Sequence, residues 1–356
     1  MGRIIVTING VQATVTKALP DRLHITVPSG AITTVVNVQT PLGNSSSPDV
    51  LFVMKDIPLN TTNNVSNNSV ISKTSDIISD IYGVPSLVWA DGSTTNSLLD
   101  IFHSHWNSTS WYSPIVRVTT NDAAPINGTF SGETPSIALD KFSRRFMVYN
   151  HGADIFMKIS LNGISWSPAI DLGFQYSSSP DSDINTPQPK IAIGKNKLHL
   201  VWVASNEIIF AQTDITDIIT EDNQLNSSFV NWDTFIYFLP TTEDSTEPDI
   251  VADSRDIAYV AWADELNNSA NFYSTIYGRY IDSTNVNYVA LSSGTSDARQ
   301  PSITLDNQDR PAVSWKQTSQ IIFTKSFDRE NVNSWGTNKN ISNNGVLGRL
   351  QKRRQS

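Results

Sequence analysis

The chain has 356 residues, of which 39% are hydrophobic and 17% are charged, a balance typical of a folded protein with a largely neutral polar surface. Its length exceeds the ~100–200 residues of one domain and predicts two domains or one large repeat array, while a formal net charge of -9 disfavours nucleic acid as a partner. The absence of cysteine excludes disulfides, thiolate metal sites and a cysteine nucleophile.

No run approaches the ~20 apolar residues that a membrane-spanning helix needs, so we expect no membrane insertion. The first eight residues lack the charged start and the long apolar core of a signal peptide. Nine Asn-x-Ser/Thr triplets would suit a glycosylated surface, although a chain rich in Asn, Ser and Thr produces such triplets by chance. We expect a secreted or cell-surface protein whose signal peptide is not part of this sequence.

Residues 1–55 contain short alternating runs separated by turn residues, which predicts β-strands. Three motifs, Asn9-Gly10-Val-Gln-Ala13, Val27-Pro28-Ser-Gly30 and Thr40-Pro41-Leu-Gly43, resemble the later strands of an IPT/TIG domain, an immunoglobulin-like fold. The resemblance implies a small β domain that serves as a spacer. Such a domain normally has further strands before its Asn-Gly hairpin, so we expect the sequence to enter it midway.

One unit recurs from about residue 60 to 345: an apolar Ile strand, an Asp or Gly turn, and a strand that ends in Val and an aromatic residue. Another strand and a more variable segment follow, which gives four strands per ~50 residues, the plan of a propeller blade. Since one unit cannot bury its own apolar faces, we expect neighbouring blades to stack through the closing aromatic residues. These are 60, 53, 60 and 53 residues apart, at Trp89, Tyr149, Trp202, Trp262 and Trp315.

Helical periodicity is nearly absent, so the predicted fold class is all-β. Only residues 215–219 favour a short helical turn. The clearest predicted strands are residues 3–8, 23–27, 198–203, 257–262 and 320–325.

The repeat resembles the Asp-box unit of sialidase-like propellers. The nearest local match is Ser160-Leu-Asn162-Gly163-Ile-Ser165-Trp166, one residue shorter than that family's Ser-x-Asp-x-Gly-x-Thr-Trp turn. The segment Ser104–Trp111 has the right length but carries Trp in place of Asp and Ser in place of Gly. Asp boxes are structural turns in the family, so the resemblance implies a propeller fold rather than catalysis.

We therefore predict a partial IPT/TIG-like domain over residues 1–55, propeller repeats over 60–345 and a basic tail over 346–356. The number of blades stays open between five and six. Ile341–Gly345 resembles the lead-in to the fifth unit, but no Ile strand follows it, which favours a truncated sixth blade. The alternative is a complete five-bladed ring.

Catalytic residues are hard to find in this pattern. The resemblance to sialidases implies three arginines, one of them in an Arg-Ile-Pro motif, and this sequence has no such motif. Another glycoside hydrolase would need two carboxylates ~5 to ~9 Å apart. The candidates are four carboxylates predicted on the loops that follow inner strands: Asp91, Asp154, Asp264 and Glu265. The adjacent pair Asp264 and Glu265 is of most interest. Adjacent residues of a strand point to opposite faces, so Asp264 and Glu265 would not share one substrate unless the strand has ended.

Metal sites are equally weak. The aspartates Asp80, Asp140, Asp253 and Asp306 recur at one turn position, which favours side chains that cap their own turns. Asp181 and Asp183 fall short of the 6–8 oxygens that calcium takes. The spacing of His103 and His105 places them on one face of a strand, but no third zinc ligand accompanies them. We predict no cofactor, and calcium is the one metal ion whose binding the sequence leaves undecided.

The less regular aromatic residues lie nearer to loops and could stack on sugars. They are Trp106, Trp111, Tyr112, Tyr176 and Tyr273. We therefore favour a non-catalytic binding module with a glycan or protein ligand, and keep a sialidase-like glycoside hydrolase as the alternative. Arginines and carboxylates that converge at one end of the propeller channel would favour the enzyme, whereas Ser, Thr and Asn would favour the binding module.

Overall fold

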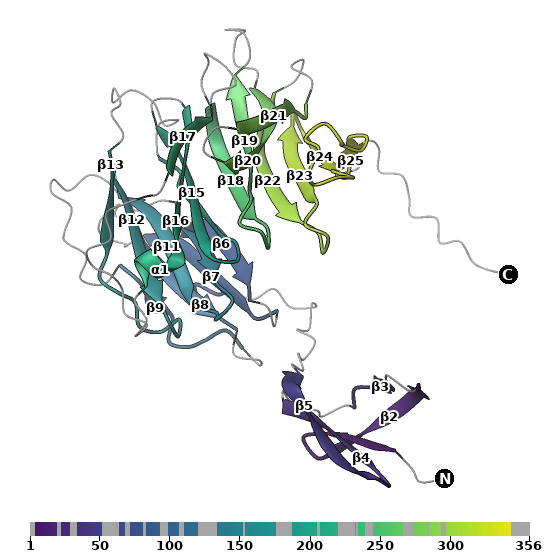
Figure 1. Cartoon of the computed structure of the whole chain (residues 1–356). Coiled ribbons are helices and arrows are strands. Elements are labelled where there is room, and N and C mark those ends of the chain that lie inside the picture. Colours follow the sequence, from purple (N-terminus) through teal and green to yellow (C-terminus); the bar gives the residue numbers. More distant parts are fainter. Residues whose placement is uncertain are drawn as a thin grey trace, which may run out of the picture. The chain divides into compact units, whose positions relative to one another are not determined.

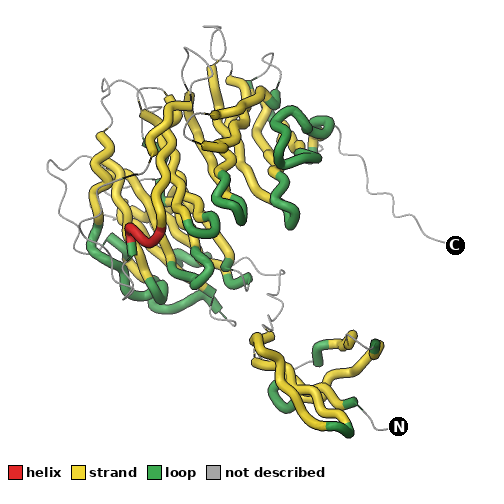
Figure 2. The backbone as a smooth tube through the Cα atoms, in the orientation of Figure 1, coloured by secondary structure: helices red, strands yellow, loops and turns green. Residues whose placement is uncertain are grey.

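The computed structural model describes residues 4–19, 23–28, 34–51, 64–67, 72–80, 83–92, 99–106, 110–119, 134–151, 154–175, 187–204, 207–219, 232, 234–238, 245–265, 273–282, 285–292 and 297–342. These residues are almost all in strands and turns, and Figure 2 shows the short helix α1 (Ile215–Ile218) among them. The all-β prediction is confirmed, and α1 lies where a helical turn was expected. No helix in this part of the chain is long and apolar enough to cross a membrane.

The chain divides into two compact units, residues 1–65 with 81–84 and 106–112, and the remainder. The first unit contains one antiparallel sheet in the order β3-β2-β1-β4-β5. Its strands are β1 (Ile5–Ile8), β2 (Val11–Ala18), β3 (Leu23–Thr26), β4 (Thr34–Thr40) and β5 (Gly43–Leu51). Asn9 and Gly10 join β1 to β2 with φ values of 49° and 75°, as a tight hairpin turn requires. The predicted boundary between residues 55 and 60 lies outside the described residues.

The second unit contains, within its described residues, five four-stranded antiparallel sheets that follow one another along the chain (Figure 1). Each sheet is ordered as its strands occur in the sequence, as in a propeller blade. Blade 1 consists of β6 (Ser72–Ser79), β7 (Pro85–Gly92), β8 (Leu99–His105) and β9 (Val116–Arg117), and blade 2 consists of β10 (Ser136–Leu139), β11 (Arg145–His151), β12 (Asp154–Ser160) and β13 (Ile170–Gln175). Blade 3 consists of β14 (Lys190–Ile193), β15 (Lys197–Ala204), β16 (Glu207–Asp214) and β17 (Thr234–Phe238), and blade 4 consists of β18 (Ser245–Ala252), β19 (Ala258–Glu265), β20 (Tyr273–Asp282) and β21 (Asn285–Ala290). Blade 5 consists of β22 (Ala298–Leu305), β23 (Pro311–Gln317), β24 (Gln320–Lys325) and β25 (Lys339–Asn340).

Consecutive blades pack through apolar faces. One buried cluster lies between each pair of neighbours from blade 1 to blade 5. The closing aromatics Tyr149, Trp202, Trp262 and Trp315 each belong to one of these clusters and are at most 5% exposed. The predicted role of the aromatic column in packing between blades is therefore confirmed at these four positions.

The first strand of each blade is the innermost, because β6, β10, β14, β18 and β22 contact one another in succession. We call the end where these five inner strands begin the upper end. The end where they turn into the second strand of each blade is the lower end, and the connecting segments there are the inner turns.

Aspartates hold the inner turns, as the sequence predicted. The Asp140 carboxylate accepts the backbone N–H groups of Phe142 and Arg144, each at 2.9 Å. Asp253 and Asp306 hold the corresponding turns of blades 4 and 5 in the same way. These carboxylates therefore act as turn caps.

A second set of polar turns joins the third and fourth strands at the lower end. In blade 2 the Ser160 hydroxyl donates to the Ser165 carbonyl at 2.6 Å, and Asn162 Oδ1 accepts the N–H groups of Ile164 and Ser165. In blade 5 the Ser326 hydroxyl contacts the Ser334 carbonyl in a longer version of the turn. Both turns are structural, and their membership of the Asp-box family stays a prediction.

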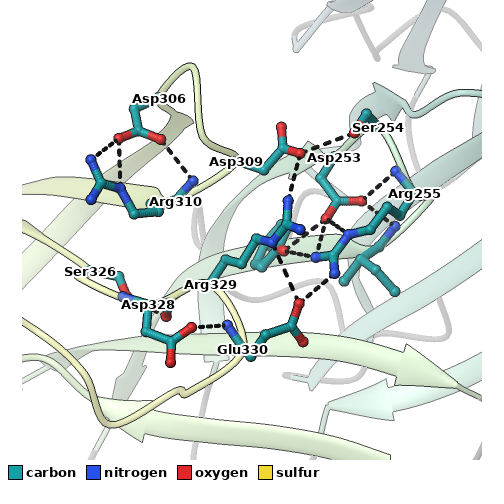
Figure 3. Close-up of polar contacts among 12 residues, drawn as sticks. Asp253, Ser254, Arg255, Asp306, Asp309, Arg310, Ser326, Asp328, Arg329 and Glu330 are labelled. Atoms are coloured by element: carbon teal, nitrogen blue, oxygen red, sulfur yellow. Dashed lines mark hydrogen bonds and ion pairs between the residues drawn. The ribbon is translucent and has the colours of Figure 1, made fainter.

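Charged residues connect blades 4 and 5 at the lower end (Figure 3). Arg255 pairs with the buried carboxylate of Asp253 at 2.6 Å and also with Glu330, which follows β24. Arg329 pairs with Asp309 at 3.1 Å, and the Ser254 hydroxyl donates to the same Asp309 at 3.0 Å. The inner turns of the two blades are thus clamped together.

Candidate ligand-binding site

The upper end carries a set of backbone bulges at the start of the inner strands. Thr74, Gln188, Glu247 and Gln300 each lie three residues before the repeated Ile and have φ values between 34° and 54°. Such left-handed residues interrupt the hydrogen-bond ladder and re-aim the side chain. The N–H of Glu247 donates to Gln188 Oε1 at 3.0 Å, and the N–H of Gln300 donates to Glu247 Oε2 at 2.7 Å. Amide and carboxylate side chains therefore link blades 3, 4 and 5 around the axis.

The four carboxylates that the sequence offered for catalysis lie at this end, in strands rather than loops: Asp91 in β7, Asp154 at the start of β12, and Asp264 and Glu265 at the end of β19. Burial and the charge of Asp171 raise the pKa of Asp154. Asp91 in β7 is 3% exposed and accepts a hydrogen bond from the Ser72 hydroxyl at 3.2 Å. Asp264 in β19 is 0% exposed and accepts one from the Ser245 hydroxyl at 2.7 Å. In each blade the serine is the directly opposed residue on the inner strand. The two Ser–Asp pairs are therefore equivalent internal braces of blades 1 and 4.

Blade 2 carries an uncharged version of this brace. The Asn150 side chain is 2% exposed, and its Oδ1 accepts both the N–H and the hydroxyl of Thr134, at 3.1 and 2.7 Å. In blade 5 the indole N–H of Trp315 donates to Gln317 Oε1 at 3.2 Å. Hydroxyl and amide groups therefore lie at the described upper end together with the carboxylates of Asp91 and Asp264 and the Arg299–Asp297 ion pair.

Another carboxylate, Asp249, lies on the inner strand of blade 4. Burial raises its pKa above the usual range, the nearby Lys190 ammonium opposes that rise, and the charge of Asp76 in blade 1 adds to it. Asp76, Lys190 and Asp249 occupy one repeat position, directly before the Ile of their blades. Two carboxylates and one lysine therefore interact electrostatically near the propeller axis.

The aromatic residues that were predicted to bind a ligand are divided between the two compact units. Trp106 and Trp111 form an isolated bridge after β8, their rings meet edge to face at 5.9 Å, and Tyr112 follows directly. Tyr273 begins β20 at the upper end of blade 4, and its side chain lies outside the described residues, as do Tyr176 and the side chain of Glu265. The structure thus brings the rings of Trp106 and Trp111 together.

Metal ligands are not brought together in the described residues, which contain no group of three or more His, Asp or Glu that could hold an ion. The His103 and His105 rings stack at 5.6 Å, next to Arg145. Burial and this guanidinium lower the pKa of His103 to about 3, so the imidazole stays neutral. Asp181 and Asp183 lie outside the described residues.

Comparisons with known proteins agree with the fold. No protein-family model and no curated protein sequence matches the chain. A Dyadobacter fermentans protein of unknown function is 9% identical, with 73% of this chain and 79% of that chain covered and a TM-score of 0.50. A mutant α-L-arabinofuranosidase of Fusarium graminearum, solved with an iminosugar inhibitor, is 12% identical over 74% and 79% of the two chains, also with a TM-score of 0.50. A mutant of the NanB sialidase of Streptococcus pneumoniae aligns with 92% of this chain and 64% of its own, at 9% identity and a TM-score of 0.47.

At such identities the likeness concerns the fold alone. The chain is a β-propeller protein with an additional N-terminal β-sheet.

Proposed function

We propose that this protein is a non-catalytic module that binds a glycan at the upper end of its propeller. The observation that carries the proposal is the state of Asp91 and Asp264. Both are buried, and a serine hydroxyl of the paired strand occupies an oxygen of each. A catalytic carboxylate must reach the scissile bond of its substrate, and these two are turned inward to brace their blades.

The exposed groups at the upper end suit sugar hydroxyls. Lys73, Thr74 and Gln300 are exposed at the start of inner strands, and Gln188 and Glu247 are partly exposed beside them. Amide, hydroxyl and charged side chains can donate hydrogen bonds to sugar hydroxyls or accept hydrogen bonds from them. The hydrogen bonds between blades hold the side chains of Gln188 and Glu247, so these two groups lose little conformational entropy on binding.

The surrounding assignments complete the proposal. We propose that the N-terminal sheet is an IPT/TIG-like spacer, that the turns after the third strands are divergent Asp boxes, and that the protein acts outside the cell or on its surface. Motifs of the sequence and the all-β fold support these points. A similar structure is an α-L-arabinofuranosidase, a glycan-active enzyme, which gives a glycan some preference over a protein ligand.

One observation favours the alternative, a glycoside hydrolase. The raised pKa of Asp249 and its interaction with a second carboxylate, that of Asp76, resemble the carboxylate pair that glycoside hydrolysis uses. Lys190 opposes the rise, and the N–H of Ile303 occupies one Asp249 oxygen at 2.9 Å. These contacts favour a structural role for Asp249, so the hydrolase remains second.

A glycan array tests the proposal. Binding should weaken at least about tenfold in a Lys73→Ala, Gln300→Ala double variant, since two contacts with the glycan are removed from the upper end. A variant with Lys17→Ala, which removes an exposed lysine of the N-terminal sheet, should bind as the parent does. No binding by the parent to any neutral or charged glycan would reject the proposal.

A further inference from the structure

The lower end contains an open cavity of about 500 Å³. The inner turns of blades 2, 3 and 4 line it. Its lining includes the partly buried apolar residues Ile193 and Ala252 and the exposed lysines Lys141 and Lys195. A volume of this size falls in the range of ordinary small-ligand sites.

The two lysines are the charged groups available to a ligand. Both side chains are exposed, and no ion pair of either is present in the described part of the chain. The third charged residue of the wall, Asp253, differs from them. Its carboxylate is saturated by Arg255, by the Tyr259 hydroxyl at 3.0 Å and by two backbone N–H groups. The cavity therefore presents two unpaired ammonium groups and one neutralised carboxylate.

An aromatic ring lies beside the first lysine. The side chain of Phe142 is 66% exposed, and Lys141 Nζ lies 5.3 Å from its ring centroid. The Arg144 guanidinium lies 5.2 Å from the same ring centroid, so the ring holds two cationic groups beside the cavity. A carboxylate bound there would gain a charge-assisted hydrogen bond from Lys141.

The turns that carry these groups are fixed in advance. Asp140 holds the turn of Lys141 and Phe142 through the backbone N–H groups of Phe142 and Arg144. Asp256 of blade 4 accepts the N–H groups of Asn196 and Lys197, at 2.8 and 3.0 Å, next to Lys195. A Cβ at Gly194 would lie 2.5 Å from this Asp256 carboxylate, so the close approach of the two turns requires glycine. Rigid turns reduce the entropy lost when a ligand binds.

We propose that this cavity binds a uronic-acid unit of an acidic glycan. The lysines take the carboxylates, and the side chains of Ile193 and Ala252 take the apolar edge of the sugar. The site lies at the end of the propeller opposite to the one that carries the proposed function. The two sites are therefore independent, and either can fail without the other.

Titration calorimetry with hexagalacturonate tests the proposal, with maltohexaose as the neutral probe of equal length. Hexagalacturonate should bind the parent and should weaken at least about tenfold in a Lys141→Ala, Lys195→Ala double variant. Phe142→Ala should weaken it at least about threefold, because the ring contact that positions the Lys141 ammonium is lost. Lys17→Ala, which removes the same charge from the N-terminal sheet, should leave the affinity unchanged. Thermal melts confirm that all variants are folded.

Several outcomes would overturn the assignment. No binding of hexagalacturonate by the parent would do so, as would an affinity of the double lysine variant within twofold of the parent. Tighter binding of hexaglutamate at the same lysines would assign the cavity to an acidic peptide instead. The Lys73→Ala, Gln300→Ala variant separates the two sites, because it should keep hexagalacturonate binding while losing the ligand of the upper end.

Discussion

The Asp249 carboxylate on the inner strand of blade 4 accepts the backbone N–H of Ile303 in blade 5, at 2.9 Å. Asp76 makes the same bond to Ile137 in blade 2, at 3.1 Å. In each case the carboxylate of the residue before one repeated Ile accepts the backbone N–H of the repeated Ile in the next blade. This polar contact lies next to the apolar clusters and fixes the register of neighbouring blades.

Replacing Asp249 tests this contact. Asp249→Ala leaves the Ile303 N–H without an acceptor and should lower the free energy of unfolding by ~1–3 kcal/mol. Asp249→Asn keeps an acceptor oxygen and should cost less. Ser302→Ala, at the same position of blade 5 with an exposed side chain, is the control and should change little. Equal urea midpoints for Asp249→Ala and Ser302→Ala would show that the contact contributes nothing.

Removing an aromatic of the column should damage the core. Trp262 is 0% exposed and packs between blades 3 and 4, so Trp262→Ala should lower the free energy of unfolding by ~3–5 kcal/mol. Phe327→Ala removes an aromatic ring that is 68% exposed and should be nearly neutral. Urea denaturation followed by tryptophan fluorescence and by circular dichroism measures both. A Trp262→Ala midpoint close to that of the parent would contradict the packing of the blades.

Acid should destabilise the protein through a buried histidine. Burial lowers the pKa of His199 to about 4, with Asp256 opposing the shift and Lys197 assisting it. Because this folded-state pKa lies below the usual 6.5, the unfolded chain binds the proton first as the pH falls. Stability should then drop by ~2 kcal/mol between pH 6.5 and pH 5 from this group.

The variant His199→Met removes the titrating ring at similar volume and should reduce that pH dependence, while the part due to His103 remains. Urea midpoints at pH 5.0, 5.5, 6.0, 6.5 and 7.0 give the comparison. An unchanged slope in the variant would mean that other groups carry the acid sensitivity.

The ion pairs should differ in strength according to burial. Arg255 contacts the fully buried Asp253 carboxylate, so Arg255→Ala should cost ~1–2 kcal/mol. The Arg117–Asp100 pair is more exposed, with 52% and 29% of the two side chains open to solvent, and Arg117→Ala should cost ~0–1 kcal/mol. Thermal melts at low and at high salt measure both. A larger loss for Arg117→Ala would contradict this ranking.

The repeat made most of the fold predictable. The recurring Ile strand, turn and closing aromatic define four interfaces between blades, and the regular spacing of Asp140, Asp253 and Asp306 indicated their role as turn caps. These features are local, because each depends on residues within one unit. Their physical meaning could therefore be inferred from one copy and checked against the others.

The sites depend on distances that the sequence does not contain. Asp264 resembled a loop carboxylate until its register with Ser245 placed it inside a strand. The lower cavity combines Lys141 and Lys195, which come from the inner turns of different blades. No local motif marks such a combination. The repeated turn positions were the one available signal, since they place residues of successive blades next to each other.

The proposed function requires that the protein binds a glycan and leaves it intact. The direct measurement is to incubate the protein overnight with the labelled glycan that binds best on an array, recover the bound fraction, and determine its mass. We expect an unaltered mass and a saturable affinity. Shortened products that disappear in Asp249→Asn, in Asp264→Asn or in Glu265→Gln would contradict the proposed function and identify a glycoside hydrolase.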